Sequence, residues 1–276
     1  MAKLDRLPWE GAIAFTAFGV SAGIRVSDAS ILEPLRAILP PDWKTATKPT
    51  VARLYSLIAG GASQRPGVRR FNILYADATR LLRTHDLDET LHQLQVSLEL
   101  FIGDRAPRRT FVHAGVVGWK GKAIVIPGRS HSGKSSLVTA FVKAGATYYS
   151  DEFAVLDERG RVHPYPVPLA LRQDASGLPR KYKVEDLAGR VGDRPLPVGL
   201  VVITRYIDGA RFRPRLASAG HAVMAMLGNT LPARRRPKRV LDVLTRAVSQ
   251  ALALRGARGE AEEAVGQLLA TAEAAT

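Results

Sequence analysis

Residues 128–135 constrain this chain more than any other part of its sequence. They read Gly-Arg-Ser-His-Ser-Gly-Lys-Ser and match the phosphate-loop pattern G-x-x-x-x-G-K-[ST]. The apolar run at residues 123–126 predicts a buried strand before the loop, and the residues after it have the apolar spacing of a helix that ends near Gly145. Strand, loop and helix therefore follow in the order that a phosphate loop requires, which predicts an α/β domain around this segment.

The residue types in this segment suit the binding of nucleotide phosphates. Gly128 and Gly133 allow backbone conformations that turn N–H groups toward phosphate oxygens, and the start of the following helix adds the positive end of its dipole. Lys134 is expected to reach the β- and γ-phosphates, and the Ser135 hydroxyl is expected to bind Mg²⁺. The other expected nucleotide contacts in this segment are Ser130, Ser132 and Ser136. A glycine turn that binds nothing is the alternative.

Two adjacent carboxylates, Asp151 and Glu152, follow the next predicted strand, residues 146–150. A strand that comes directly after the loop helix is expected to lie close in the sheet, which would bring both acids to the edge where Lys134 and Ser135 lie. One carboxylate can then bind Mg²⁺ while the other accepts a proton from an incoming hydroxyl. The residues alone leave open which acid has which role, and acids that only cap a turn are the alternative.

Composition excludes several other kinds of chemistry. No cysteine occurs among the 276 residues, so disulfides, thiolate zinc sites and cysteine nucleophiles are excluded. We assign no role to His131, and four further histidines lack metal-ligand spacing: His85, His92, His163 and His221. The first ten residues contain no apolar signal core, and no uncharged apolar stretch approaches about 18 residues. We therefore expect a soluble, cytoplasmic protein that does not bind a membrane.

The chain is strongly basic, with 40 Lys and Arg against 25 Asp and Glu, a net charge of +15 and a pI near 10.5. This charge favours an acidic partner, although an arginine-rich composition spread over the surface explains part of it. The one dense basic run, residues 234–239, could dock phosphates or acidic side chains, or form a solvated loop between helices. Nucleic acid is the less favoured partner, because no aromatic residues for base stacking interleave this run.

A polar, proline-containing joint at residues 105–109 divides the chain into two expected domains, 1–108 and 109–276. The first is predicted to be a small α+β domain. Its expected strands lie within residues 12–26, 51–58 and 71–75, and its expected helices at residues 30–39 and 88–101. We expect it to recognise the acceptor or a partner.

The second domain is predicted to begin with an antiparallel hairpin, residues 111–118 and 123–126, which leads into the phosphate loop. Two further hairpins are expected within residues 153–165 and 200–216, and helices at residues 219–227, 240–254 and 260–272. Dinucleotide-binding folds commonly place the loop at the start of a βαβ crossover in a parallel sheet, so a hairpin before the loop favours another topology.

Three segments of this domain resemble the ATP core of HPr kinase/phosphorylase and its relatives, whose fold is similar to that of ATP-dependent phosphoenolpyruvate carboxykinase. They are Val112-His113-Ala114, residues 123–136 and Tyr149-Ser150-Asp151-Glu152. Residues 168–172 and 222–230 are also similar to segments that recur in HPr-kinase-like proteins of biosynthetic clusters. The resemblance covers residues 110 to 230 or so, and implies an α/β fold with a mixed-sheet phosphate-loop core, a smaller N-terminal α+β domain and C-terminal helices.

The resemblance also implies roles for individual residues. The loop lysine and serine match the ligands of the nucleotide and of Mg²⁺. Asp151 matches the acid that prepares the nucleophile, and Glu152 stands where HPr kinases have a second aspartate, which makes it a metal-ligand candidate beside Ser135. His113 matches a histidine near the phosphates, and Arg172 matches a basic residue that faces them. A histidine satisfied by a neighbouring backbone group is the alternative for His113.

Motifs and resemblance together imply a divergent kinase that uses ATP and Mg²⁺ to phosphorylate a hydroxyl, expected to be a serine hydroxyl, on a peptide, protein or small molecule. ATP is the expected nucleotide because no N-K-x-D guanine signature occurs. HPr is not the expected acceptor, because the Leu-Glu-Ile-Arg-Gly-Leu-Gly segment of true HPr kinases is missing. An acidic acceptor and a homo-oligomer are compatible with the sequence. The alternatives are a phosphorylase or ATPase at the same site, and a non-catalytic nucleotide-sensing module that binds nucleic acid.

Overall fold

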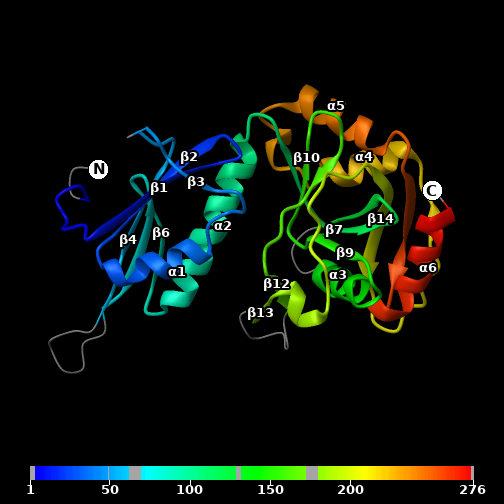
Figure 1. The fold of residues 1–276 in the computed structure, drawn as a ribbon, viewed down its shortest axis with the longest axis horizontal. Coiled ribbons are helices and arrows are strands. Elements are labelled where there is room, and N and C mark those ends of the chain that lie inside the picture. Colours follow the sequence, from blue (N-terminus) through cyan, green and yellow to red (C-terminus); the bar gives the residue numbers. More distant parts are fainter. Residues whose placement is uncertain (1–3, 49, 62–69, 129–131, 172–179, 275–276) are drawn as a thin grey trace. The chain divides into compact units, whose positions relative to one another are not determined.

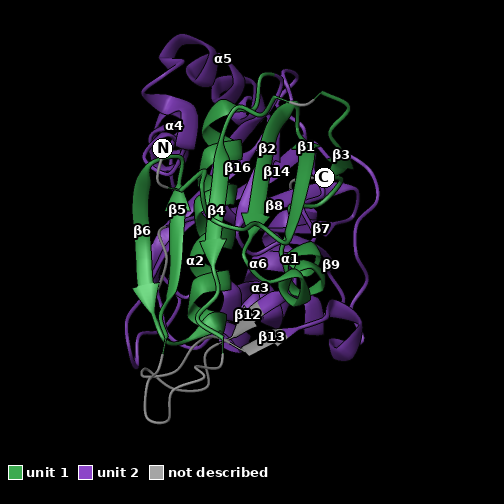
Figure 2. Ribbon diagram, turned by 90° about the vertical axis from the view of Figure 1, so that its left-hand side faces the viewer, with its two compact units in different colours: residues 1–107 green, residues 108–276 purple. Residues whose placement is uncertain are grey.

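The structure is a computed structural model that describes residues 4–48, 50–61, 70–128, 132–171 and 180–274. It divides into two compact units, residues 1–107 and 108–276 (Figures 1 and 2). This division falls inside the proline-containing joint, one residue before the boundary expected from the sequence. Across the described residues the chain is a mixed α/β protein with two mixed sheets and six α-helices. None of these helices is long and apolar enough to cross a membrane.

The first unit is a mixed sheet with strand order β3-β1-β2-β4-β5-β6, contacted by two helices. Its strands are β1 (Gly11–Ala17), β2 (Val20–Val26), β3 (Lys44–Thr45), β4 (Leu54–Ile58), β5 (Asn72–Ala76) and β6 (Thr79–Thr84), and its helices are α1 (Leu32–Ala37) and α2 (Leu87–Arg105). Asp86 caps α2, since its carboxylate accepts the backbone N–H groups of Asp88 and Glu89 at 2.8 and 3.2 Å. The predicted strands and helices are present here, whereas β3 and β6 were not predicted. The glycines at both ends of residues 60–67 predict a loop there, and this segment lies largely outside the described residues.

The second unit is built on an eight-stranded mixed sheet with the path β11-β10-β7-β8-β14-β16-β15, and β9 also pairs with β7. Its strands are β7 (Thr110–Trp119), β8 (Lys122–Pro127), β9 (Thr147–Ser150), β10 (Phe153–Leu156), β11 (Val162–His163), β14 (Val198–Tyr206), β15 (Arg215–Leu216) and β16 (Leu252–Arg258). A separate short pair consists of β12 (Leu169–Leu171) and β13 (Arg180–Tyr182). The helices are α3 (Lys134–Lys143), α4 (Ala219–Leu227), α5 (Pro237–Val248) and α6 (Ala261–Ala274).

Helices cover both faces of the central strands. Along β8, Ala123 and Val125 pack in a core with α4 and α5, whereas Ile124 and Ile126 pack in a core with α3 and α6. A strand that is buried on both faces needs apolar residues at every position, which explains the continuous run before the phosphate loop. A methyl group at Gly115 would lie 2.6 Å from Val138 Cγ2, so α3 packs directly against β7.

The predicted hairpin before the phosphate loop is confirmed. Strands β7 and β8 pair antiparallel from Ala114↔Pro127 to Trp119↔Lys122. The two turn residues Lys120 and Gly121 both have positive φ, 45° and 80°, as a tight two-residue hairpin turn requires. On its other side β8 pairs parallel with β14, and β14 pairs parallel with β16. The carboxyl ends of these three parallel strands therefore meet at the edge where the phosphate loop follows β8.

Two predictions about the last third of the chain are wrong. Residues 200–216 do not form a hairpin, because β14 pairs with β8 and β16 while β15 pairs with β16. The helix expected at residues 240–254 ends as α5 at Val248, and residues 252–258 form the strand β16. Alanine, leucine and arginine favour helices, but pairing with β14 along the whole length of β16 overrides that local preference.

Candidate functional site

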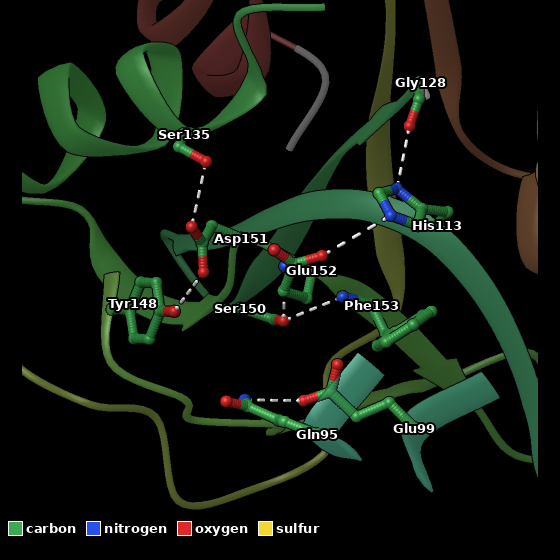
Figure 3. Close-up of polar contacts among 10 residues, drawn as sticks. All are labelled: Gln95, Glu99, His113, Gly128, Ser135, Tyr148, Ser150, Asp151, Glu152 and Phe153. Carbon is green, nitrogen blue, oxygen red and sulfur yellow. Dashed lines mark hydrogen bonds and ion pairs between the residues drawn. The ribbon is translucent and has the colours of Figure 1, made fainter. Parts of the chain in front are cut away.

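The described part of the phosphate loop comprises Gly128 and residues 132–135 (Figure 3 includes Gly128 and Ser135). Gly133 is the N-cap residue of α3 with φ of 80°, a left-handed conformation that glycine adopts without strain. Helix α3 begins at Lys134, so its first turn faces the loop. Two predicted site residues, Ser130 and Arg172, lie outside the described residues, as does His131.

Lys134 is buried beside the two carboxylates. Only 7 % of the Lys134 surface is exposed to solvent. Burial lowers the pKa of its ammonium group, and the charges of Glu152 and Asp151 act in the opposite direction. The loop lysine and both predicted acids thus belong to one electrostatic cluster.

Asp151 is the most enclosed member of this cluster, at 1 % exposure, and both of its carboxylate oxygens accept hydrogen bonds (Figure 3). The Ser135 hydroxyl donates to Oδ2 at 2.9 Å. The Tyr148 hydroxyl lies 2.9 Å from Oδ1 and 2.8 Å from the Val167 carbonyl oxygen, so its one proton is shared between these two acceptors. Burial raises the pKa of Tyr148 well above its usual value, so the phenol keeps its proton and remains a donor. Asp151 is therefore held rigidly against the first turn of α3.

The backbone at the two acids explains how they reach the loop helix. Strands β9 and β10 both run antiparallel to β7, and residues 151–152 interrupt them. Tyr149 is an extra residue in this pairing, because Tyr148 faces Val117 while Ser150 faces Val116. The Ser150 hydroxyl accepts the N–H groups of Glu152 and Phe153 at 3.1 and 2.9 Å, which fixes the bend. The acids thus lie at a break within a strand path rather than simply beyond a strand's end.

His113 on β7 joins the cluster from the other side. Its Nδ1 donates to the Gly128 carbonyl oxygen at 3.0 Å, since a carbonyl can only accept. Its Nε2 lies 3.4 Å from Glu152 Oε2. Burial and the nearby Lys134 charge lower the pKa of His113 from 6.5 to about 4, so the imidazole is neutral at pH 7 and this contact is not a charged ion pair. In the neutral ring Nε2 carries a lone pair, so Nε2 and the Glu152 carboxylate can hold one proton between them.

Ser135 and Asp151 present oxygen atoms of the kind that Mg²⁺ prefers as ligands. Among the described residues no group of three or more His, Asp or Glu side chains could hold a metal ion. Magnesium that binds together with phosphates needs only one or two protein oxygens, in an octahedron with ligands at about 2.0–2.1 Å, whose neighbouring ligands are then about 2.9 Å apart. The oxygens of Ser135 and Asp151 have this separation, 2.9 Å. Asp151 rather than Glu152 is therefore the carboxylate next to the predicted metal ligand Ser135.

The structure brings together Lys134, Ser135, Asp151, Glu152 and His113, all predicted from the sequence. Two other predicted contacts are less central: Ser132 packs against Gly128, and Ser136 is exposed. Tyr148 and Ser150 were not predicted as site residues. Ser150 belongs to the segment Tyr149-Ser150-Asp151-Glu152 that carries the resemblance, whereas no sequence signal distinguishes Tyr148 from other strand residues.

The comparisons with known proteins add no family to this picture. No family model matches the chain, and no curated protein matches it significantly.

Proposed function

We propose that this protein is an ATP- and Mg²⁺-dependent kinase of the HPr-kinase-like type, which transfers the γ-phosphoryl group to a hydroxyl, with serine as the favoured acceptor group. The observation that carries the proposal is the hydrogen bond between Ser135 and Asp151 at the start of the phosphate-loop helix. It joins the predicted metal-binding hydroxyl to a buried carboxylate, next to a buried lysine. The same groups could serve a phosphorylase or an ATPase, which remain the alternative enzymes.

The different surroundings of the two acids support a division of labour. Asp151 is buried, and both of its carboxylate oxygens accept hydrogen bonds. Because one of them contacts the Ser135 hydroxyl, Asp151 would hold Mg²⁺ together with Ser135. Bound Mg²⁺ would neutralise charge that develops on the transferred phosphoryl group. The Glu152 side chain is 34 % exposed and faces His113, so it is the better placed acid to accept the proton of the attacking hydroxyl. This assignment exchanges the roles that the resemblance implied for the two residues.

In the proposed reaction, the acceptor, ATP and the two acids account for every bond that changes and for the proton that is released. The acceptor oxygen forms a bond to the γ-phosphorus while the bond between that phosphorus and the bridging oxygen of ADP breaks. The hydroxyl proton passes to the Glu152 carboxylate and can be shared with Nε2 of His113. Lys134 offsets the negative charge on the β- and γ-phosphates, and the buried position of the cluster strengthens this attraction.

A basic pocket in the second unit supports an acidic acceptor. It has a volume of about 550 Å³ and is lined by Arg236, Lys238, Arg239 and Arg246 with the carboxylates Glu158 and Asp242, and Arg239 is paired with Glu158 at 3.0 Å. None of the phosphate-loop residues that the structure describes lines it. The sequence had left open a solvated loop for residues 234–239. Residues 234–236 lie in the connection that precedes α5, and Lys238 and Arg239 belong to its first turn. We propose that this pocket docks an acidic segment of the acceptor.

The test of the proposed function is nucleotide binding and phosphoryl transfer. Wild-type protein should bind ATP with Mg²⁺ in isothermal titration and transfer labelled γ-phosphate to serine-containing candidates, detected by mass spectrometry. Lys134→Ala should reduce turnover by about 10²–10³-fold, because it removes the cation that faces the phosphates. Lys143→Ala is the matched control, since Lys143 is exposed at the other end of α3.

Two outcomes would contradict the proposal. Wild-type protein that does not bind ATP, or Lys134→Ala protein that binds and turns over ATP normally, would remove the phosphate-loop assignment. ATP binding without turnover in the presence of any acceptor would favour the nucleotide-sensing alternative, and salt-sensitive binding of DNA or RNA would support it further.

A further inference from the structure

A buried arginine, Arg258, contacts the phosphate loop from the end of β16. Its residue is 1 % exposed, which makes it the largest fully buried side chain among the described residues. Its two terminal nitrogens donate to backbone carbonyls, Nη2 to Gly133 at 2.7 Å and Nη1 to Gly259 at 2.9 Å. A buried guanidinium is costly unless its donors are satisfied, so a position that retains one needs a specific explanation.

The topology accounts for this contact. Strands β8, β14 and β16 are parallel, and the phosphate loop follows β8 at the edge where β16 ends at Arg258. Gly133 leaves the space that the guanidinium occupies, since a Cβ atom there would lie 2.5 Å from Nη2 of Arg258. The second motif glycine therefore has two functions, a left-handed backbone conformation and room for this arginine.

The carbonyl that receives Arg258 belongs to a peptide group that matters for phosphate binding. The same Gly133 oxygen accepts the N–H of Leu137 at 3.2 Å, which is the first hydrogen bond of α3. The peptide group is planar, so fixing the Gly133 carbonyl also fixes the Lys134 N–H, which points the opposite way. In α3 that direction leads out of the helix N-terminus, where anions bind. A cationic donor on the carbonyl also polarises the peptide group and strengthens its N–H as a donor.

We infer that Arg258 is a positioning residue that holds the peptide group between Gly133 and Lys134 in the orientation needed to bind a nucleotide phosphate. The inference rests on the proposed function, which supplies the nucleotide phosphate as the ligand. The hydrogen bond by which Arg258 holds the Gly133 carbonyl does not depend on nucleotide. A purely structural tie between β16 and α3 is the competing interpretation. The two differ, because only a positioning role couples Arg258 to phosphate affinity.

The experiment compares Arg258→Met and Arg258→Lys with the matched changes at Arg255, which is exposed on the same strand. Amide hydrogen exchange, measured without nucleotide, reports how firmly Arg258 holds the Gly133 carbonyl at the start of α3. Because Arg258→Met loses a charge-assisted hydrogen bond, we expect roughly ten- to a hundredfold faster exchange at the Leu137 amide. The exchange rates of the α6 amides should not change. The dissociation constant of Mg-ATP should rise by about tenfold or more while the acceptor KM stays constant, and Arg258→Lys should lie between wild type and Arg258→Met.

The remaining outcomes would contradict either the inference about Arg258 or the proposed function, and the measurements distinguish the two. Unchanged exchange at Leu137, or equally faster exchange across the whole unit, would leave Arg258 without a specific effect on the loop. Local acceleration with unchanged Mg-ATP affinity would reduce it to a structural tie. If wild-type protein does not bind ATP at all, the proposed function fails, and exchange still decides whether Arg258 anchors the loop. If Arg258→Met does not fold, Arg258→Lys against Arg255→Lys carries the same comparison.

Discussion

Replacing Asp151 by asparagine should change how the protein uses Mg²⁺ much more than how stably it folds. The asparagine oxygen can still accept the Tyr148 hydroxyl, and the Ser135 hydroxyl can rotate to accept from the new amide. Two charge-assisted hydrogen bonds then become neutral ones, which costs about 2 kcal/mol in total. Release of a buried carboxylate from its desolvation penalty offsets part of that cost. We expect a folded variant whose free energy of unfolding falls by less than about 2 kcal/mol.

The metal requirement of Asp151→Asn should rise sharply. The substitution removes the negative charge that lies 2.9 Å from the serine oxygen. Losses of this kind around bound metals typically weaken binding by about 10- to 100-fold, or about 1.4–2.8 kcal/mol. The assay is initial turnover at saturating ATP over a series of Mg²⁺ concentrations. Glu152→Gln should keep the wild-type Mg²⁺ midpoint within about twofold but lose about 10²–10⁴ in maximal rate, because it removes the proton acceptor.

The control is Asp157→Asn. Asp157 is a hydrogen-bonded carboxylate of the same unit that contacts His163 and lies at the β10–β11 turn, outside the cluster. Its substitution should leave both the Mg²⁺ midpoint and the maximal rate unchanged. A shifted Mg²⁺ midpoint in Glu152→Gln, with a normal one in Asp151→Asn, would refute the assignment of the two acids and restore the roles that the resemblance implied.

Three further predictions concern the rest of the site. The pKa of His113 is about 4 in the folded chain and 6.5 in the unfolded chain, so the unfolded chain binds a proton first as pH falls. The free energy of unfolding should therefore decrease by up to about 3 kcal/mol between pH 6.5 and pH 4. Urea unfolding of wild type and His113→Asn across this range tests it, and parallel curves would contradict it. Gly133→Ala should lower stability by about 1–3 kcal/mol, because it strains a backbone with φ of 80° and displaces Arg258, and an unchanged urea midpoint would argue against that. Neutralising Arg236 and Lys238 together should raise the KM of an acidic acceptor, less so as salt rises, without affecting the KM of ATP; indifference to both mutation and salt would return the pocket to solvated surface.

The parts of the fold that follow local rules could be predicted from the sequence. The hairpin before the phosphate loop depends on a two-residue turn with glycine between apolar runs, and the structure has it at Lys120 and Gly121. Helix α2 follows from its apolar spacing and from Asp86 at its start. In such elements the information that fixes the structure lies within a few residues of the chain.

The roles of the two acids could not be predicted, because they depend on a small irregularity. The sequence predicted both acids near the loop, but not which partner each one contacts, because neighbouring side chains of a regular strand point to opposite faces. The extra residue Tyr149 and the bend held by Ser150 place both acids in the cluster, with Asp151 against Ser135 and Glu152 against His113. Neither the bulge nor the bend leaves a pattern that periodicity can detect.

The absence of Arg258 from the predicted site has the same physical cause as the wrong helix boundary. Residues 252–258 resemble a helix end in composition, and only parallel pairing with β14 makes them a strand that ends beside the phosphate loop. Arg258 and Gly133 are 125 residues apart in the sequence, so no local pattern connects them. Once β16 is placed in the sheet, an arginine at its last position must lie at the edge where β8 leads into the loop. Long-range strand pairing therefore determines both the missed strand and the proposed positioning residue.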